Sequence, residues 1–292
     1  MKSPLVTVCV VTYNQEEYIR QCLESIVTQE MEYGFQVIVY DDASSDATPD
    51  IIKEFAEKYD FLKANLREVN VGAFQNFIEC HAAATTPLVC HCDGDDYWFP
   101  FKLKIQTEYM LDNSDCNVSW TRMEIYDERS ARAMPDRIPS HFVGRRFERS
   151  ELIRYVAVGL HSSKMYRKCE VSLPDFEPVD YLLNVLQVRD GYATFVSSKV
   201  LGCYRAGIGI ASSGNKTRLI INKCHKFYRK VFPDLIASIN SSAITLAIVE
   251  LKNKRFNTAK VYLTGVTFKK LITTINYILD NIKTSKYLKF PR

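Results

Sequence analysis

The sequence lacks the features that would place it in a membrane or secretory class. No uninterrupted apolar stretch approaches the roughly 20 residues that a bilayer-spanning helix needs, so we expect that the chain does not cross a membrane. Met1-Lys2-Ser3-Pro4 runs directly into a strand pattern, without the apolar segment and cleavage site of a signal peptide. We therefore predict a reducing, cytoplasmic setting, in which the sequons at Asn117, Asn215 and Asn240 carry no glycan.

The cysteines also lack the spacing of a zinc site. There are nine, an odd number, and several lie in apolar runs, where reduced cysteine behaves as a small hydrophobe. Cys80-His81 and Cys90-His91-Cys92 contain no C-x-x-C pair, and the second group sits in a strand-like run whose side chains alternate between faces. We predict buried structural cysteines.

Acidic residues are scarce near the C-terminus. Residues 215–292 hold sixteen Lys and Arg but only three acids, a net charge of +13. Because the whole chain carries +4, residues 1–214 carry −9. This asymmetry predicts two regions with different partners.

What the sequence does contain is a repeated alternation of strands and helices in its first third. The run 5–11 is almost entirely β-branched and apolar, as in a strand buried on both faces of a parallel sheet. Further strands are predicted at 35–40, 62–68 and 87–92, and helices at 15–29, 48–59 and 73–84, with Thr48 as an N-cap. The alternation predicts an α/β fold with a doubly wound, mostly parallel, Rossmann-like sheet.

The remaining chain is less regular. Residues 124–148 combine arginines with small and polar residues and are predicted to be a mobile loop. Beyond 213 the pattern is helical. We predict a domain over 1–213, with halves 1–115 and 116–213, followed by a basic helical region over 214–292. The other predicted elements are helices at 99–113, 149–158, 180–191, 217–232, 235–251, 256–266 and 268–282, and strands at 118–120 and 194–204, with a turn into a strand over 159–167.

Polar clusters follow three of the first strands. Thr12-Tyr13-Asn14, Asp41-Asp42 and Asp93-Gly94-Asp95-Asp96 all fall at carboxyl ends, where doubly wound sheets bind ligands. Three carboxylates within four residues repel one another unless a positive charge neutralises them. Oxygen ligands suit Mg²⁺ or Mn²⁺, which can also hold a phosphate. An isolated cluster would be a solvated turn, but three converging loops favour a binding site.

Together, Val11-Thr12-Tyr13-Asn14, Asp41-Asp42-Ala43-Ser44-Ser45-Asp46, Asn70-Val71-Gly72 and Asp93-Gly94-Asp95-Asp96-Tyr97-Trp98 resemble family-two glycosyltransferases of the GT-A fold. The resemblance covers about residues 4–115, and the continuation at 100–103 is similar to bacterial capsule and lipopolysaccharide transferases. It implies an inverting transfer of a sugar from a nucleotide-sugar donor, favouring UDP, with Mn²⁺ or Mg²⁺ as cofactor. The acceptor would be a cell-surface glycan, often lipid-linked.

The resemblance also implies residue roles. Asp95 and Asp93 would bind the metal. Asp180 would be the catalytic base, with capping of its helix as the alternative role, and Asp175 and Glu177 are competitors. The donor-binding residues would be Thr12, Tyr13, Asn14, Asp41, Asp42, Ser44, Asn70, Gly72, Asn76, Asp93, Gly94 and Asp95. The sugar or acceptor pocket would hold Asp96, Tyr97, Trp98, His161 and Arg205, with Tyr97 and Trp98 equally plausible as core aromatics.

The basic tail has two interpretations. No nucleic-acid motif accompanies it, so we expect no nucleic-acid partner. Its cations alternate with aromatic and aliphatic residues such as Phe227, Tyr228, Phe268 and Ile272, a pattern typical of anionic membrane surfaces. We predict peripheral attachment to the inner face of the cell membrane; a solvated basic face is the alternative.

Two other functions share parts of these patterns. A sugar-1-phosphate nucleotidyltransferase would use the same sheet and carboxylates, but it requires a glycine-rich phosphate loop after the first strand, and residues 10–15 contain no glycine. A non-catalytic glycan-binding or partner-binding module would turn over no nucleotide sugar.

Overall fold

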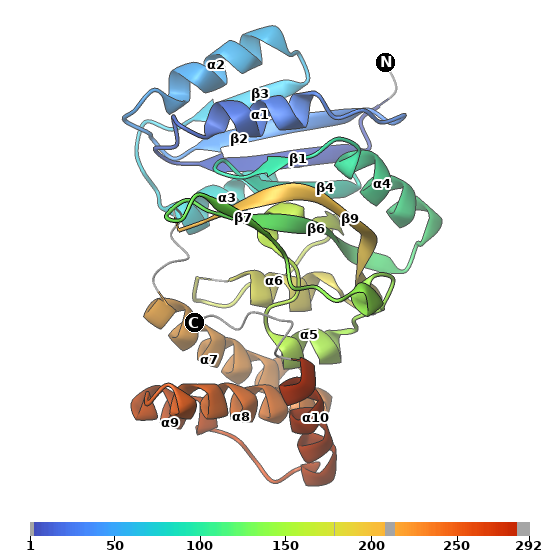
Figure 1. The fold of residues 1–292 in the computed structure, drawn as a ribbon, viewed down its shortest axis with the longest axis vertical. Helices are drawn as coiled ribbons and strands as arrows, with labels where there is room; N and C mark the ends of the chain where they lie inside the picture. Colours follow the sequence, from blue (N-terminus) through green and yellow to red (C-terminus); the bar gives the residue numbers. More distant parts are fainter. Residues whose placement is uncertain (1–2, 178, 208–213, 285–292) are drawn as a thin grey trace.

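The computed structural model describes residues 3–177, 179–207 and 214–284. Its centre is a nine-stranded sheet whose main path runs β3-β2-β1-β4-β8-β6-β9-β5, with β7 paired to β6. Helices pack on both faces, and the C-terminal helices gather at the end of the molecule away from β3 and α2 (Figure 1). The predicted α/β class is confirmed.

The first half of the sheet is parallel, as predicted. Its aliphatic strands are buried on both faces, and Val6, Val8 and Val10 of the first strand are fully buried. The elements are β1 (Val6–Thr12), β2 (Phe35–Asp41), β3 (Leu62–Leu66) and β4 (Leu88–Asp93), with α1 (Ile19–Val27), α2 (Thr48–Lys58) and α3 (Ala73–Ala82). The register pairs Thr12 with Asp41 and Val11 with Asp93, so these strands end at one edge.

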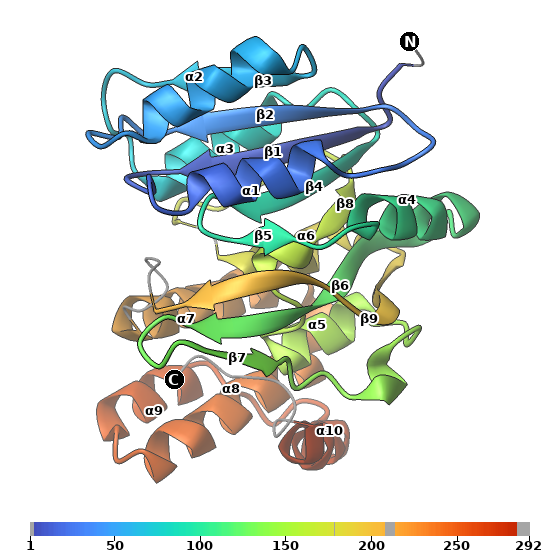
Figure 2. The same cartoon turned by 45° about the horizontal axis from the view of Figure 1, so that its top comes forward.

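The second half of the sheet is mixed. After β5 (Tyr97–Trp98) and α4 (Lys102–Asp112), β6 (Cys116–Asp127) runs parallel to β9 (Tyr192–Ala206). The short β8 (Met165–Arg167) lies antiparallel between β4 and β6 and joins the two halves through backbone hydrogen bonds. Figure 2 shows β5, β6 and β9 below the parallel strands.

Two expectations are wrong. The predicted loop over 124–148 contains the end of β6, the strand β7 (Arg132–Pro135) and a 3₁₀ turn at Ser140–Phe142. All residues of β7 are exposed, so the alternation that reveals a strand is missing. Thr48 is the first residue of α2 and not its N-cap, which is Ala47; the Thr48 hydroxyl instead accepts a hydrogen bond from the Gln15 amide at 2.9 Å.

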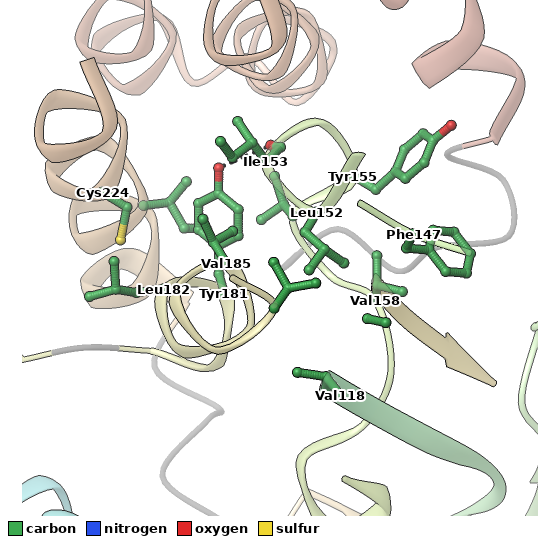
Figure 3. Close-up of a cluster of buried hydrophobic side chains, with 14 of the residues drawn as sticks. Val118, Phe147, Leu152, Ile153, Tyr155, Val158, Tyr181, Leu182, Val185 and Cys224 are labelled. Carbon is green, nitrogen blue, oxygen red and sulfur yellow. Dashed lines mark hydrogen bonds between the residues drawn. The ribbon is translucent and has the colours of Figure 1, made fainter. Parts of the chain in front are cut away.

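The helices of the second half pack against one another and the sheet. They are α5 (Arg149–Tyr155), α6 (Asp180–Gln187), α7 (Gly214–Val231), α8 (Ile236–Lys252), α9 (Phe256–Leu263) and α10 (Leu271–Thr284). One hydrophobic cluster runs from β6 through α5 and α6 to Cys224 of α7 (Figure 3). A second cluster fills the opposite face, between the sheet and α1, α2 and α4.

Two further expectations concern membranes and cysteines. Within the described residues, one helical segment, Pro233–Lys252, is long and apolar enough to cross a membrane by length and composition, but 61% of its apolar window is buried inside the protein. We interpret it as the central helix of the C-terminal region. Eight of the nine cysteines are buried and Cys169 is partly buried, all as free thiols, which agrees with the sequence prediction.

Candidate active site

The loop after β4 lies directly on the end of β1. Gly94 has no room for a side chain: a Cβ there would lie 2.5 Å from Gln15 Oε1 and 2.8 Å from Thr12 Cβ. The Thr12 hydroxyl donates to Gln15 Oε1 at 2.7 Å, which fixes this contact. The glycine of the acidic motif therefore allows two strand ends to approach closely.

The loops after β1 and β2 are joined by hydrogen bonds. The Asn14 amide donates to Ser44 Oγ at 2.7 Å, and the Ser45 amide donates to Asn14 Oδ1 at 2.9 Å. Ser44 in turn donates through its amide to Asp41 Oδ2 at 2.9 Å and through its hydroxyl to Asp41 Oδ1. Burial raises the pKa of Asp41. Tyr13 stays outside this network, with 46% of its surface exposed.

Asp42 holds the third loop. Its buried carboxylate accepts hydrogen bonds from the amides of Val71 and Gly72, at 2.8 and 2.9 Å, and its carbonyl accepts one from Asn70 Nδ2 at 2.9 Å. Gly72 has φ of 90°, a conformation that favours glycine. Asp42 therefore organises the 70–72 loop from inside the protein.

Asn76 also points inward. It is buried, donates to the carbonyl of Tyr40 at 3.0 Å, and accepts from Arg67 Nε at 2.9 Å. Both ends of the amide are thus bonded to protein groups. The structure brings Thr12, Asn14, Asp41 and Ser44 together at the sheet edge, but it uses Asn76 in packing.

The acidic cluster is crowded and largely buried. Burial and the charge of Asp93 raise the pKa of Asp95 to about 7, and the same two causes raise the pKa of Asp96. Burial also acts to raise the pKa of Asp93, but His91 and the Ser162 hydroxyl outweigh it, so its pKa lies below the usual value. Three carboxylates at this density favour a bound cation.

Arg205 ties the cluster to β9. Its amide donates to Asp96 Oδ1 at 2.8 Å, and its guanidinium donates to the carbonyl oxygen of Asp95 and pairs with Glu128 at 3.2 Å. Among the described residues, Asp96 Oδ2 has no hydrogen-bond partner. Such an orphaned, buried carboxylate oxygen is costly, because nothing compensates its lost hydration.

Beside Arg205 lies a cavity of about 240 Å³. Tyr97 contributes to its wall, and the Arg205 guanidinium lies 4.9 Å from the ring centres of both Tyr18 and Tyr97. Trp98, by contrast, is buried: its Nε1 donates to the carbonyl of Ser162 at 2.8 Å and Lys102 Nζ lies 3.8 Å from a ring centre. Tyr97 therefore lines a polar pocket, whereas Trp98 is a core residue.

A histidine network behind Asp93 was not predicted. His91 Nε2 lies 3.0 Å from Asp93 Oδ1, and His91 Nδ1 lies 2.9 Å from His81 Nε2, whose other nitrogen lies 2.7 Å from the Tyr166 hydroxyl. The His161 ring stacks on His91, with centres 3.9 Å apart. The sequence held one signal for it: residues 91 and 93 share a face of one strand. The sequence pattern of these histidines was interpreted only in terms of zinc ligation, so the histidine network was not predicted.

His161 joins the acidic motif to Asp180. Its Nδ1 lies 3.1 Å from Asp180 Oδ1, while its Nε2 is buried and has no hydrogen-bond partner within the described part of the chain. Asp180 is the first residue of α6, and its side chain remains 52% exposed. Burial of its surroundings raises the pKa of Asp180. The two predicted sides of the site therefore meet through one histidine.

These residues fit a divalent metal ion. One donor atom from each of His91, Asp93 and His161 lies within 4.8 Å of the other two, and the buried His161 Nε2 offers a free lone pair or proton. Asp95, which the sequence predicts as a metal ligand, is not one of the three residues of this group. A mixed nitrogen and oxygen donor set suits Mn²⁺ better than Mg²⁺, which prefers oxygen.

Comparisons with known proteins identify the family and the fold. The family model described as glycosyl transferase family 2 matches residues 7–171, more than half of the chain. An uncharacterized protein of Mycobacterium tuberculosis is 40% identical over 124 residues, which are 42% of this chain and 36% of that protein. The chain thus matches about a third of this relative's length. The residues matched by the family model end before α6.

Solved structures resemble the whole fold. S. aureus TarS in complex with UDP-GlcNAc superposes with a TM-score of 0.66 at 19% identity, covering 99% of this chain and 84% of that one. The mannosyltransferase PcManGT from Pyrobaculum calidifontis, in complex with GDP-Man and Mn²⁺, gives 0.57 at 15% identity, covering 97% and 81%. At these identities the likeness concerns the fold, which is that of GT-A glycosyltransferases.

Proposed function

The chain belongs to glycosyl transferase family 2, and we propose that it transfers a sugar from a nucleotide-diphosphate sugar to a hydroxyl of a growing cell-surface glycan. The observation that carries this proposal is the meeting of three polar strand ends around a crowded carboxylate cluster. A UDP-sugar is the favoured donor, since the similar TarS structure holds UDP-GlcNAc.

The loops that follow β1, β2 and β3 would bind the donor. We assign the nucleoside to Thr12, Tyr13 and Asp41, because the exposed ring of Tyr13 offers an aromatic face for a base. Asn14 and Ser44 position this loop, and Asn70 and Gly72 lie on the loop that Asp42 fixes. Asn76 supports this loop from inside the protein, because it accepts a hydrogen bond from Arg67.

Asp95 and Asp93 would hold the metal, together with His161 Nε2, the nearby histidine nitrogen that has no hydrogen-bond partner among the described residues. When bound, a divalent ion neutralises the charge that develops on the departing nucleoside diphosphate. His91 and Ser162 keep the Asp93 carboxylate ionised and oriented, since both contact it directly. Mn²⁺ fits this mixed donor set, and PcManGT was solved with Mn²⁺.

Asp180 is our assignment for the base. It would take the proton of the acceptor hydroxyl while that oxygen attacks the anomeric carbon, and the C–O bond to the diphosphate breaks with inversion. His161 orients the carboxylate through the 3.1 Å contact, and half of the side chain remains open to an acceptor. Tyr97 and Arg205 would line a sugar or acceptor pocket, which Asp96 supports by accepting the hydrogen bond of the Arg205 amide and in which Trp98 takes no direct part.

The acceptor and the division of the chain complete the proposal. We propose a lipid-linked glycan of capsule or lipopolysaccharide type as acceptor, with donor residues in 1–115, acceptor residues in 116–213, and a basic helical region over 214–292. One hydrophobic cluster continues across the last boundary, from Val118 to Tyr262. The enzyme would work in the cytoplasm, at the inner face of the membrane.

A panel of nucleotide sugars tests the function. We expect Mn²⁺-dependent release of the nucleoside diphosphate from one donor, and a loss of about 10²–10³-fold in Asp95→Asn. Asp190→Asn, which changes a fully exposed aspartate, should match the wild type. Pyrophosphate release from a nucleoside triphosphate would instead indicate a nucleotidyltransferase. No release from any donor would leave a non-catalytic binding module.

A second variant tests the base. Asp180→Asn should bind the donor with wild-type affinity in calorimetry, but lose transfer to the acceptor. His161→Gln should lower the rate of transfer less, because the carboxylate remains. Equal turnover by Asp180→Asn on the true acceptor would remove Asp180 from this role.

A further inference from the structure

α10 presents an apolar stripe to solvent. Its exposed residues recur every three or four positions, which places them on one face of the helix. Ile272 is 77% exposed, and Phe268, just before the helix, is 88% exposed. The exposed apolar residues of this segment are Phe268, Leu271, Ile272, Ile275, Leu279 and Ile282.

The opposite face of α10 is polar and is the face that packs inward. Thr274, Asn281 and Thr284 are buried, and Asn281 Nδ2 donates to Thr245 Oγ1 of α8 at 3.2 Å. Asp280 pairs with Arg154 of α5 and accepts a hydrogen bond from the Tyr155 hydroxyl at 2.7 Å. A surface helix normally buries its apolar side, so this orientation is inverted. The polar contacts of Asn281 and Asp280 hold the helix in this orientation.

The charge around the stripe has one sign. Asp280 is the only acid in residues 251–284, and Arg154 neutralises it. The exposed lysines in the helix and just before it are Lys269, Lys270 and Lys283. An apolar stripe bordered by lysines complements an anionic lipid surface, whereas a second copy of this helix would bring like charges together.

We propose that α10 lies in the plane of an anionic lipid bilayer, with its apolar stripe among the upper acyl chains and its lysines at the headgroups. This sharpens the sequence prediction for 215–292. Tyr228, one of the aromatic residues in that pattern, is buried, and Phe227 packs partly against the core, so these two residues do not supply the contact. The inference rests on the proposed function only for its purpose, which is to bring the site to a lipid-linked acceptor.

Flotation of the full chain with vesicles tests the surface. We expect binding to vesicles of equal parts phosphatidylcholine and phosphatidylglycerol, and about tenfold weaker binding to pure phosphatidylcholine. The double variant Ile272→Ser, Leu279→Ser should reduce partitioning by at least about tenfold. The matched control Leu111→Ser, Met134→Ser removes two exposed apolar residues elsewhere and should bind normally.

The lysines provide an independent arm. Lys269→Glu with Lys283→Glu should weaken binding to anionic vesicles by about tenfold and remove most of its salt dependence. Unchanged binding by the Ile272, Leu279 double variant, or equal binding of the wild type to both vesicle types, would overturn the proposal. So would concentration-dependent dimers, seen by sedimentation without lipid binding, that the same substitutions abolish.

Nucleotide-sugar hydrolysis in lipid-free buffer separates the two proposals. We expect the α10 variants to hydrolyse the donor at the wild-type rate, because the stripe lies outside the site. Hydrolysis without vesicle binding would overturn only the membrane surface. Vesicle binding without any hydrolysis would overturn only the proposed activity.

Discussion

The sheet edge and the C-terminal helix α10 depart from ordinary protein surfaces in opposite ways. At the edge, polar groups are crowded together and buried, and Asp96 Oδ2 has no partner among the described residues. On α10, apolar groups are spread in the open, while Asn281 and Asp280 are turned inward and bonded. Each region is incomplete by itself, and what it lacks identifies its partner: a cation and phosphates at the edge, a lipid surface on the helix.

The two regions also differ in what holds them. The edge is built from backbone amides and side-chain oxygens of loops far apart in sequence, such as Asp42 with the 70–72 loop. α10 is held by a few side-chain contacts to α5 and α8. We therefore expect substitutions at the edge to alter activity, and substitutions on the stripe to alter neither activity nor folding.

The largest effect should come from the acidic cluster. Asp93→Asn should lower donor turnover by about 10²–10³-fold, because a negative charge of the proposed metal site is lost. Its melting temperature should not fall, since Asp93 raises the pKa of Asp95 and Asp96 by repulsion, and removing its charge relieves that repulsion. Calorimetry measures the melting temperature, and nucleotide release measures the turnover. A large drop in stability would show that the hydrogen bonds of Asp93 stabilise the fold more than its charge destabilises it.

Gly94→Ala should have the next largest effect. The added Cβ would lie 2.5 Å from Gln15 Oε1 and 2.8 Å from Thr12 Cβ, so the loops must separate, at a cost of about 1–3 kcal/mol in stability. Gly144→Ala is the control, because nothing lies within 4 Å of its Cβ and only its positive φ is penalised. Urea unfolding compares them. Equal activity in both variants would show that close approach at Gly94 is unnecessary.

Asp42→Ala should cost about 1–3 kcal/mol of stability, because two amides of the 70–72 loop lose their buried acceptor. Hydrogen exchange should rise at Val71 and Gly72. Asp50→Ala serves as a control, since Asp50 bonds only Lys53 at the surface in the described part of the chain. Unchanged protection of the loop would contradict the role given to Asp42.

The smallest effect should be on α10. Ile272→Ala should change the free energy of unfolding by no more than about 0.5 kcal/mol, because the side chain is exposed. Ile26→Ala, in a fully buried position of α1, should cost about 2–5 kcal/mol. Urea unfolding measures the pair. A large loss from Ile272→Ala would mean that this stripe is covered in the folded protein.

Secondary structure could be predicted from the sequence wherever burial leaves a pattern of apolar residues. Strands such as β1 and β4 were found because both faces are apolar, and the motif acids follow from their place after β4. β7 was missed because all its residues are exposed. The link from His81 to Asp93 depends on packing between α3 and β4, which no local pattern contains. Periodicity revealed that α10 is amphipathic, but not which face turns inward.

The strand β8 has a mechanical consequence. It joins β4 to β6 by backbone hydrogen bonds, so the proposed donor and acceptor sides stand on one continuous sheet. Bending between the two sides would break these bonds, which makes the sheet stiff at this point. We therefore expect substrates to enter and leave by movement of the loops along the edge of the sheet, while the spacing of β4 and β6 stays fixed.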